Sequence, residues 1–320
     1  MRLTDARKEK ARVQQSIRDA LHEHVLLIAN RSPDEHWRKS KPAIPLLSVG
    51  VAQGTSADDY RVAVRIARHG YRIELLNRIL SKHRANDLHV QYVGRVFPLG
   101  VGSLAQSSGS SVSHYLTGAG TIGCPVRDVA TGAVMLLSNN HVIALENDAV
   151  PGDPVIDPGR DDGGTSPANT VGTFSRCVNI DFSGAANVVD CAVADLAPGI
   201  ELSRPAGAGF VYDPALPPGM LSKTSVVKKI GRSTGLTTGT VTAIEMEQFS
   251  VDYQNGPATF QSQFEVTGVS GQFAAHGDSG SLVVSASGAA VGLLFAVSET
   301  GVAYVNPIQN VLDLLGIQLI

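Results

Sequence analysis

One five-residue segment presents a hydroxyl suited to nucleophilic chemistry. Residues 277–281 read Gly-Asp-Ser-Gly-Ser, so that Ser279 lies between glycines that let the backbone turn tightly. Such a turn also directs the N–H groups of Gly277 and Ser279 into one small space, where they could hold a developing oxyanion. Because the same residues occur in ordinary hairpin turns, the serine needs partners before it predicts catalysis.

A histidine and an aspartate provide these partners. His141 follows an apolar strand and a turn-forming Asn pair. A serine becomes a good nucleophile when a neighbouring imidazole accepts its hydroxyl proton. Asp190 lies in the apolar segment 189–194, where a buried carboxylate is costly unless it is paired. We therefore predict Ser279 as nucleophile, His141 as general base and Asp190 as the residue that orients the imidazole. Asp181 is the weaker alternative to Asp190.

The order His, Asp, Ser resembles that of the chymotrypsin/trypsin-like serine proteases, whereas subtilisin-like and α/β-hydrolase enzymes use other orders. A closer resemblance, over residues 99–320, is to a bacterial branch of trypsin-like proteins akin to the plant Narrow Leaf group. It is carried by GTIGCPV at 120–126, LLSNNHVIA at 136–144, VDCAVA at 189–194, KIGRSTGLTTGTVTAI at 229–244, HGDSGSLVV at 276–284 and AVGLLFA at 290–296. It implies a double β-barrel, the three roles given above and an oxyanion hole at Gly277 and Ser279.

Two departures from this resemblance bear on activation. Vertebrate members carry a disulfide cysteine after the histidine, where this chain has Val142. They also pair the aspartate before the serine with a new N-terminus made by cleavage, and no cleavage motif is evident near residue 110. Asp278 therefore needs another partner, and constitutive activity stays open.

The sequence says less about the pocket that would select the substrate. Phe273 stands six residues before Ser279, where relatives that cut after Lys or Arg carry an acid, and no acid lies between Thr267 and Asp278. A pocket without a carboxylate does not compensate a buried cation, so a small or apolar P1 residue is expected. By resemblance the pocket residues are Phe273, Phe295, Ala296 and Val297, with His276 at the rim.

The elements that position these residues follow from periodicity. Short β-branched runs between Gly, Pro, Asn and Asp turns from residue 100 onward predict a mostly β chain, and the proline-rich stretch 205–218 divides it into two β-barrels. Segments 46–52, 60–67, 72–83 and 88–97 predict a small α+β unit of the order β-β-α-β. The predicted parts are 1–32 (N-terminal helix), 33–98 (small α+β domain), 99–204 (first barrel) and 205–320 (second barrel and a short C-terminal helix).

Residues 3–29 predict an amphipathic helix, followed by a linker over 30–45. Apolar side chains recur at spacings of four and three, namely Val13, Ile17, Leu21, Val25 and Ile28. This stripe is expected to pack on the chain itself; docking of a partner or formation of a homo-oligomer through it stays open.

Net charge and composition bear on which partners and which compartment to expect. The net charge of −3 gives no reason to expect nucleic acid as a partner, and the apolar runs are too short to span a membrane. The charged N-terminus lacks the apolar core of a secretory signal, and the three cysteines suit free thiols in a reducing compartment, so the chain is predicted to be cytoplasmic.

No cofactor or metal is expected. The match to GxGxxG at 118–123 lacks the strand and helix that a dinucleotide site needs. The aspartates at 153, 157, 161 and 162 lack the regular spacing of a calcium loop. The prediction is a serine endopeptidase that acts on protein or peptide substrates. The alternatives are a trypsin-fold scaffold with little turnover, or an esterase that uses the same site.

Overall fold

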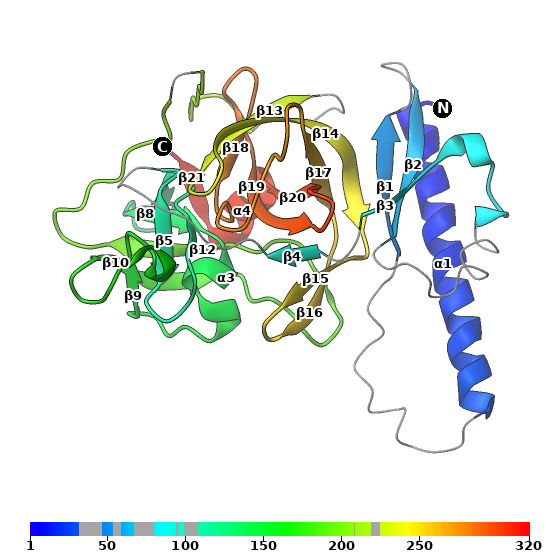
Figure 1. The fold of residues 1–320 in the computed structure, drawn as a ribbon, viewed down its shortest axis with the longest axis horizontal. Coiled ribbons are helices and arrows are strands. Elements are labelled where there is room, and N and C mark those ends of the chain that lie inside the picture. The colour runs from blue at the N-terminus through cyan, green and yellow to red at the C-terminus, as the bar shows by residue number, and fades with distance from the viewer. Residues whose placement is uncertain are drawn as a thin grey trace.

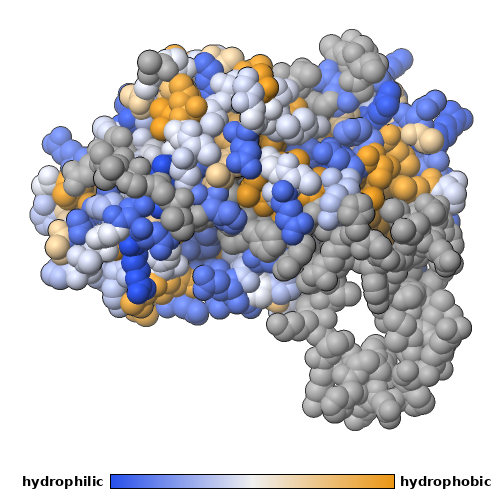
Figure 2. Space-filling model, in the orientation of Figure 1, coloured by the Kyte–Doolittle hydropathy of each residue, from blue (hydrophilic) through white to orange (hydrophobic). Residues whose placement is uncertain are grey.

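Two β units make up most of the chain, and a long helix stands against a small sheet at one end of the molecule (Figure 1). This computed structural model describes residues 1–31, 47–53, 59–66, 80–93, 96–98, 108–207, 209–218 and 225–320. On the face drawn in Figure 2, hydrophobic residues form separate patches among hydrophilic ones, as on an ordinary globular surface. Among the described residues, no helix is both long and apolar enough to cross a bilayer.

The C-terminal half forms a closed barrel of six strands. They are β13 (Val226–Gly231), β14 (Gly235–Glu247), β17 (Gln263–Gly268), β18 (Leu282–Ser285), β19 (Ala290–Ser298) and β20 (Ala303–Pro307). The order β13-β18-β19-β20-β17-β14 closes because β13 also pairs with β14. The alternating burial of β13 shows the two-residue period of a strand with one face inside the barrel.

The first β unit, which precedes this barrel in the chain, forms an eight-stranded sheet. Over the described residues its two end strands do not pair with each other. In sheet order the strands are β21 (Ile317–Leu319), β7 (Pro125–Asp128), β8 (Val134–Ser138), β12 (Ala192–Leu196), β10 (Thr170–Cys177), β9 (Pro154–Ile156), β5 (Ser111–His114) and β6 (Gly120–Thr121). Short helical turns lie between them: α3 (Asn140–Ile143), η3 (Leu145–Asn147) and η4 (Arg160–Asp162). The predicted C-terminal helix is α4 (Ile308–Leu315). The strand after it, β21, was not predicted and returns the chain to this first sheet.

A third, small sheet lies beside the site described below. It consists of β11 (Ala186–Asn187), β16 (Gly256–Phe260) and β15 (Phe249–Tyr253). The last two strands form a hairpin whose inward residues, Phe249, Val251 and Tyr253, are buried. This hairpin extends from the second barrel, and its tip contacts the turn η3 of the first unit.

The N-terminal helix packs on the chain itself, as predicted, and the surface it covers is a small sheet. Helix α1 (Leu3–Arg31) places Val13 and Ile17 against β1 (Leu47–Gln53), β2 (Tyr60–Ile66) and β3 (Leu88–Tyr92), with η2 (Ala85–Asp87) leading into β3. Most of the predicted linker at 30–45 and of the predicted helix at 72–83 lies outside the described residues. The sheet is continuous with the second barrel, because β1 pairs with β14. A buried ion pair, Arg65 with Glu265 at 2.8 Å, joins the two units.

The predicted third strand, 88–97, is two separate strands. Strand β3 ends at Tyr92, and residues Val96–Pro98 form β4, which pairs with β19 of the second barrel instead of with β2. The burial of Val93 and Val96 in a cluster with Phe295 and Ala296 accounts for the change of sheet. With this correction, the predicted mostly β, double-barrel fold preceded by a helix is confirmed.

Candidate active site

His141 and Asp190 meet in a direct hydrogen bond. His141 lies in α3, which closely follows β8, and Asp190 lies two residues before the first residue of β12, which pairs with β8. This pairing brings the ends of the two strands together, and His141 Nδ1 lies 2.5 Å from Asp190 Oδ2. The Asp190 carboxylate is completely buried, as its apolar sequence context predicted.

The buried carboxylate of Asp190 is held by four donors. Its Oδ1 accepts the N–H groups of Asn140 at 2.7 Å and of His141 at 3.3 Å. Its Oδ2 accepts the Tyr253 hydroxyl at 2.7 Å as well as His141 Nδ1–H. The side chain of Asn306, on β20, braces the backbone of Asp190 by accepting its N–H and donating to its carbonyl. Charge-assisted hydrogen bonds of this kind offset the cost of burying a carboxylate.

The arrangement fixes the tautomer of His141. An ionised carboxylate only accepts, so the proton of the neutral imidazole must reside on Nδ1, and Nε2 carries the lone pair. Within the described part of the chain, Nε2 has no hydrogen-bond partner. The imidazole is therefore oriented by Asp190 and has a free acceptor for an incoming proton.

Ser279, which comes from the second barrel, directly follows a tight turn formed by residues 275–278. The Asp278 N–H donates to the Ala275 carbonyl at 3.1 Å, and Gly277, the third residue of the turn, has φ +101°. That conformation suits glycine, because a Cβ would be strained there. The Ser279 side chain is buried, and its hydroxyl donates to the Phe295 carbonyl at 3.1 Å. His141 Nε2 accepts no hydrogen bond from it in this conformation.

The loop around Gly120 joins the two halves. A Cβ at Gly120 would lie 2.5 Å from the Val142 side chain and 2.8 Å from the Ser279 carbonyl, so only glycine fits between them. Thr121 donates its N–H to Ser279 O at 2.7 Å and its hydroxyl to Gly277 O at 2.6 Å. The residue after His141 and the backbone of Ser279 thus both lie against one glycine.

Asp278 has the partner that the sequence left open. Its buried carboxylate lies 3.0 Å from Lys229 Nζ, on β13, and accepts the Thr234 hydroxyl at 2.6 Å. It also accepts the backbone N–H groups of Ser233 at 2.9 Å and Ala275 at 3.0 Å. These bonds tie the turn before Ser279 to β13 and to the loop that follows it.

Lys229 is completely buried, and desolvation lowers its pKa from the ordinary value while the Asp278 carboxylate acts in the opposite direction. Its ammonium also donates to the Thr234 hydroxyl and the Gly235 carbonyl. The buried ammonium thus has three acceptors, one of them the Asp278 carboxylate, and loss of either charge would leave the other buried and unpaired.

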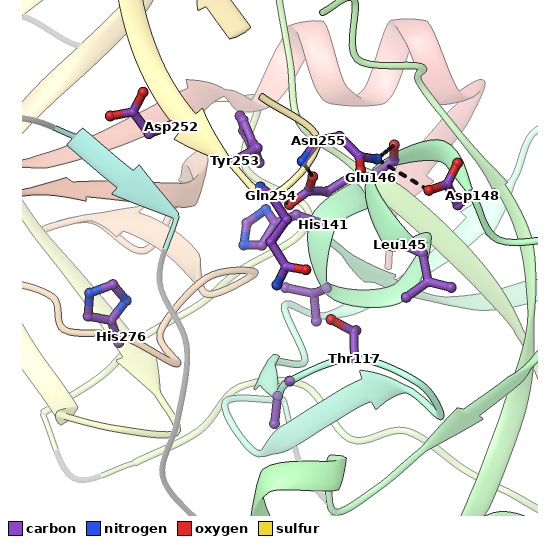
Figure 3. Close-up of a pocket in the computed structure, with 13 residues that line it drawn as sticks. Thr117, His141, Leu145, Glu146, Asp148, Asp252, Tyr253, Gln254, Asn255 and His276 are labelled. Carbon is purple, nitrogen blue, oxygen red and sulfur yellow. Dashed lines mark hydrogen bonds between the residues drawn. The ribbon is translucent and has the colours of Figure 1, made fainter. Parts of the chain in front are cut away.

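An open cleft of about 470 Å³ lies over His141 (Figure 3). Its lining comes from both sides of the site: Thr117, Gly118, Ala119, His141, Val142, Leu145, Glu146, Asp148, Asp252, Tyr253, Gln254, Asn255 and His276. His276, expected at a pocket rim, is exposed and lines this cleft with His141. In the described residues, no three His, Cys, Asp or Glu side chains converge as metal ligands would.

The other expected pocket residues lie deeper. Phe273 and Val297 pack in the core of the second barrel, and Phe295 and Ala296 pack in the cluster that includes Val96. None of the four is among the residues that line the cleft. Their role in substrate selection stays a prediction. The three cysteines are free, with Cys124 and Cys191 buried and Cys177 half-buried.

Sequence reasoning missed Tyr253 and Lys229. Lys229 stands at an inward position of β13, between the buried Val227 and Gly231, and the argument applied to Asp190, that a charge in an apolar strand needs a partner, also applies to it. Tyr253 has no comparable signal, since an inward tyrosine in a hairpin is an ordinary core residue.

No known family model and no curated protein matches the chain. Solved structures that resemble it include a glutamic acid specific serine protease that uses a histidine triad in substrate binding, with 18% identity, a TM-score of 0.47, and coverage of 67% of this chain and 100% of that one. Protease A of Thermobifida fusca shares 16% identity at a TM-score of 0.42, covering 68% and 99% of the respective chains. Cellulomonas bogoriensis chymotrypsin shares 18% at a TM-score of 0.41, covering 67% and 97%. Similarity at this level assigns no activity.

Removing the Lys229 ammonium should destabilise the protein. Lys229→Met leaves Asp278 buried without its cation and should lower the free energy of unfolding by about 3 kcal/mol. Chemical denaturation measures this, with Lys228→Met, a half-buried neighbour, as the matched control. The double variant Lys229→Met/Asp278→Asn should recover part of the loss. Equal stability of the two single lysine variants would contradict the assigned pairing.

Proposed function

We propose that the chain is a serine endopeptidase that hydrolyses peptide bonds through an acyl-enzyme on Ser279. The observation that carries this proposal is the hydrogen bond from His141 Nδ1 to the buried Asp190 carboxylate. It leaves Nε2 as a proton acceptor on an imidazole that lines an open cleft. A structural histidine would have no need of this combination of a sequestered anion and a free acceptor.

The reaction begins with rotation of the Ser279 hydroxyl. In the structure Oγ donates to Phe295 O, and a turn about the Cα–Cβ bond, a fast rotamer change, would redirect it toward His141. Nε2 then accepts the hydroxyl proton while Oγ bonds to the substrate carbonyl carbon. Asp190 stabilises the imidazolium, which returns the proton to the leaving amine as the C–N bond breaks. A water molecule then attacks the acyl-enzyme, with His141 again accepting the proton and passing it to Ser279 Oγ, and the carboxylic acid is released.

The N–H groups of Gly277 and Ser279 are proposed to hold the tetrahedral oxyanion. The turn that carries them is rigid, since Asp278 is tied to Lys229 and Thr121 donates to Gly277 O. A preorganised donor pair is usually a large term in acyl transfer, because no reorganisation is needed at the moment of reaction. The ion pair between Lys229 and Asp278 also supports constitutive activity, because Asp278 already has a cationic partner and needs no new N-terminus made by cleavage.

Peptides with small or apolar P1 residues are the proposed substrates. The expected pocket residues Phe273, Phe295 and Ala296 are apolar and buried, and they bring no anion to the neighbourhood of Ser279. A guanidinium or ammonium placed among them would be desolvated without compensation.

A second candidate is a scaffold of the same fold with little turnover. The bond from Ser279 Oγ to Phe295 O favours it, because in this conformation the nucleophile is not bonded to its base. An esterase that uses the same three residues would accept a non-peptide acyl group and release an alcohol in place of an amine.

A fluorophosphonate probe should label the folded wild-type protein at Ser279. Ser279→Ala should abolish labelling, and His141→Ala should slow it by about 1,000-fold or more, because the hydroxyl loses its base. Labelling is followed by intact-protein mass spectrometry, and Ser287→Ala, on an exposed turn, is the control. A folded wild type that resists the probe would favour the scaffold. Labelling with turnover of esters but not of peptides would favour the esterase.

Substrate selection can be measured with peptides that differ only at P1. Peptides with Val or Leu at P1 should exceed the Arg peptide in kcat/KM by about tenfold or more, since an apolar pocket cannot neutralise the guanidinium. Preferential cleavage after Arg would refute the assignment of an apolar pocket.

A further inference from the structure

Tyr253 lies where the two halves of the site meet. Its hydroxyl donates to Asp190 Oδ2 at 2.7 Å, on the same oxygen that accepts His141 Nδ1–H. Its ring meets the His141 imidazole edge-on, with centroids 5.8 Å apart. Burial and the Asp190 carboxylate raise the pKa of Tyr253 well above its ordinary value, so the hydroxyl keeps its proton and acts as a donor.

A carboxylate clamp holds the hairpin that carries Tyr253. Glu146, in η3 and five residues after His141, accepts the N–H groups of Gln254 at 3.0 Å and of Asn255 at 2.7 Å, one on each carboxylate oxygen. Figure 3 shows these side chains around the cleft. Glu146 adopts a left-handed conformation, φ 54°, which turns it toward the hairpin tip. Such a conformation is uncommon for residues other than glycine and needs compensating contacts.

We propose that Tyr253 is a positioning residue for catalysis, held by Glu146, and that it sets how strongly Asp190 acts on His141. This inference rests on the proposed function. A hydroxyl donated to Oδ2 withdraws charge from the carboxylate and fixes the oxygen that faces Nδ1. The hairpin thereby adds a fourth member to the arrangement of Asp190, His141 and Ser279.

The test is the pH dependence of kcat/KM for Tyr253→Phe. Loss of the hydroxyl leaves more negative charge on Asp190, which favours protonated His141. The acidic limb of the profile should therefore move to higher pH by about half a unit. The value at the optimum should fall by about tenfold, chiefly in kcat.

Tyr304→Phe is the matched control, because it also removes one hydroxyl from the same buried cluster. The Tyr304 hydroxyl is buried without a hydrogen-bond partner in the described residues, so its loss should leave the acidic limb unmoved. If Tyr253→Phe does not fold, Glu146→Asp, which keeps the charge but is too short to hold both hairpin N–H groups, should move the limb in the same direction. A fall in kcat/KM with an unmoved limb would overturn the proposal. A wild type that no fluorophosphonate labels would instead overturn the proposed function.

A different observation concerns the edge of β19 that faces away from β20, beside Ser279. Along this edge, residues Ala290–Leu293 face β18, and Leu294 exchanges hydrogen bonds with Gly280 and Ser281. Phe295 then accepts the Ser279 hydroxyl, and β4 covers the next three residues, with Pro98 opposite Ala296 and Val96 opposite Ser298. The Ser279 turn thus lies between β18 and β4 on one edge.

The direction of β4 matters for substrate access. It runs antiparallel to β19, so its C-terminal end points toward Phe295 and hence toward the Ser279 hydroxyl. An extended peptide that delivers a carbonyl to Ser279 would gain its backbone hydrogen bonds from this edge, as peptides do when they add a strand to a sheet. We infer that β4 occupies the strand position of the substrate, and that peptides must displace it.

A reversible lock tests this inference, which also rests on the proposed function. Val96→Cys/Ser298→Cys places two thiols on directly opposed residues, where a disulfide can form. The oxidised protein should lose peptide turnover by about tenfold or more in kcat/KM, and reductant should restore it. Labelling by a small fluorophosphonate, which needs no strand position, should persist. Each single cysteine variant, treated with the same oxidant, is the control.

Weakening β4 gives the opposite change. Phe97→Pro removes a backbone donor from β4 and should raise peptide kcat/KM without changing the labelling rate. Unchanged peptide turnover in both the locked and the weakened protein, with normal labelling, would overturn the inference and make β4 a purely structural strand.

Discussion

The candidate site depends on one buried carboxylate. Asp190 is costly to desolvate, and the structure compensates it with the Nδ1–H of His141, two backbone N–H groups and the Tyr253 hydroxyl. Each donor comes from an element that the carboxylate therefore holds in place: the turn after β8, and the hairpin β15–β16. A single electrostatic requirement thus brings together parts of the chain that are far apart in sequence and fixes the imidazole tautomer that the proposed chemistry needs.

The same physical principle orders the other half of the site. Asp278 and Lys229 are both fully buried, and neither charge would be tolerated without the other. Because Asp278 immediately precedes Ser279, this ion pair fixes the turn that presents the proposed nucleophile. The cation comes from within β13, so the turn is ordered by the folded chain itself.

The contacts around β19 join the turn that carries Ser279 to the N-terminal unit. The strand lies in the second barrel, accepts the Ser279 hydroxyl through Phe295, and carries β4 on the adjacent residues of the same edge. Strand β4 belongs in sequence to the N-terminal unit, whose β1 also pairs with β14 of that barrel. The N-terminal unit is therefore attached to the barrel at two edges, one of which lies beside the proposed nucleophile. This placement gives the unit a means to influence the site.

The sequence by itself determined the mostly β fold, the helix packed through Val13 and Ile17, and the pairing of His141 with Asp190. These follow from local periodicity and from the cost of an unpaired charge in an apolar strand. Only the tertiary structure decided that Tyr253 donates to Asp190, that Lys229 is the partner of Asp278 and that β4 joins β19. A local pattern shows that a buried charge needs a partner, as it does for Asp190 and Lys229. Which side chain or strand becomes that partner depends on how the barrels, the hairpin and the strands pack in space, which no local pattern encodes.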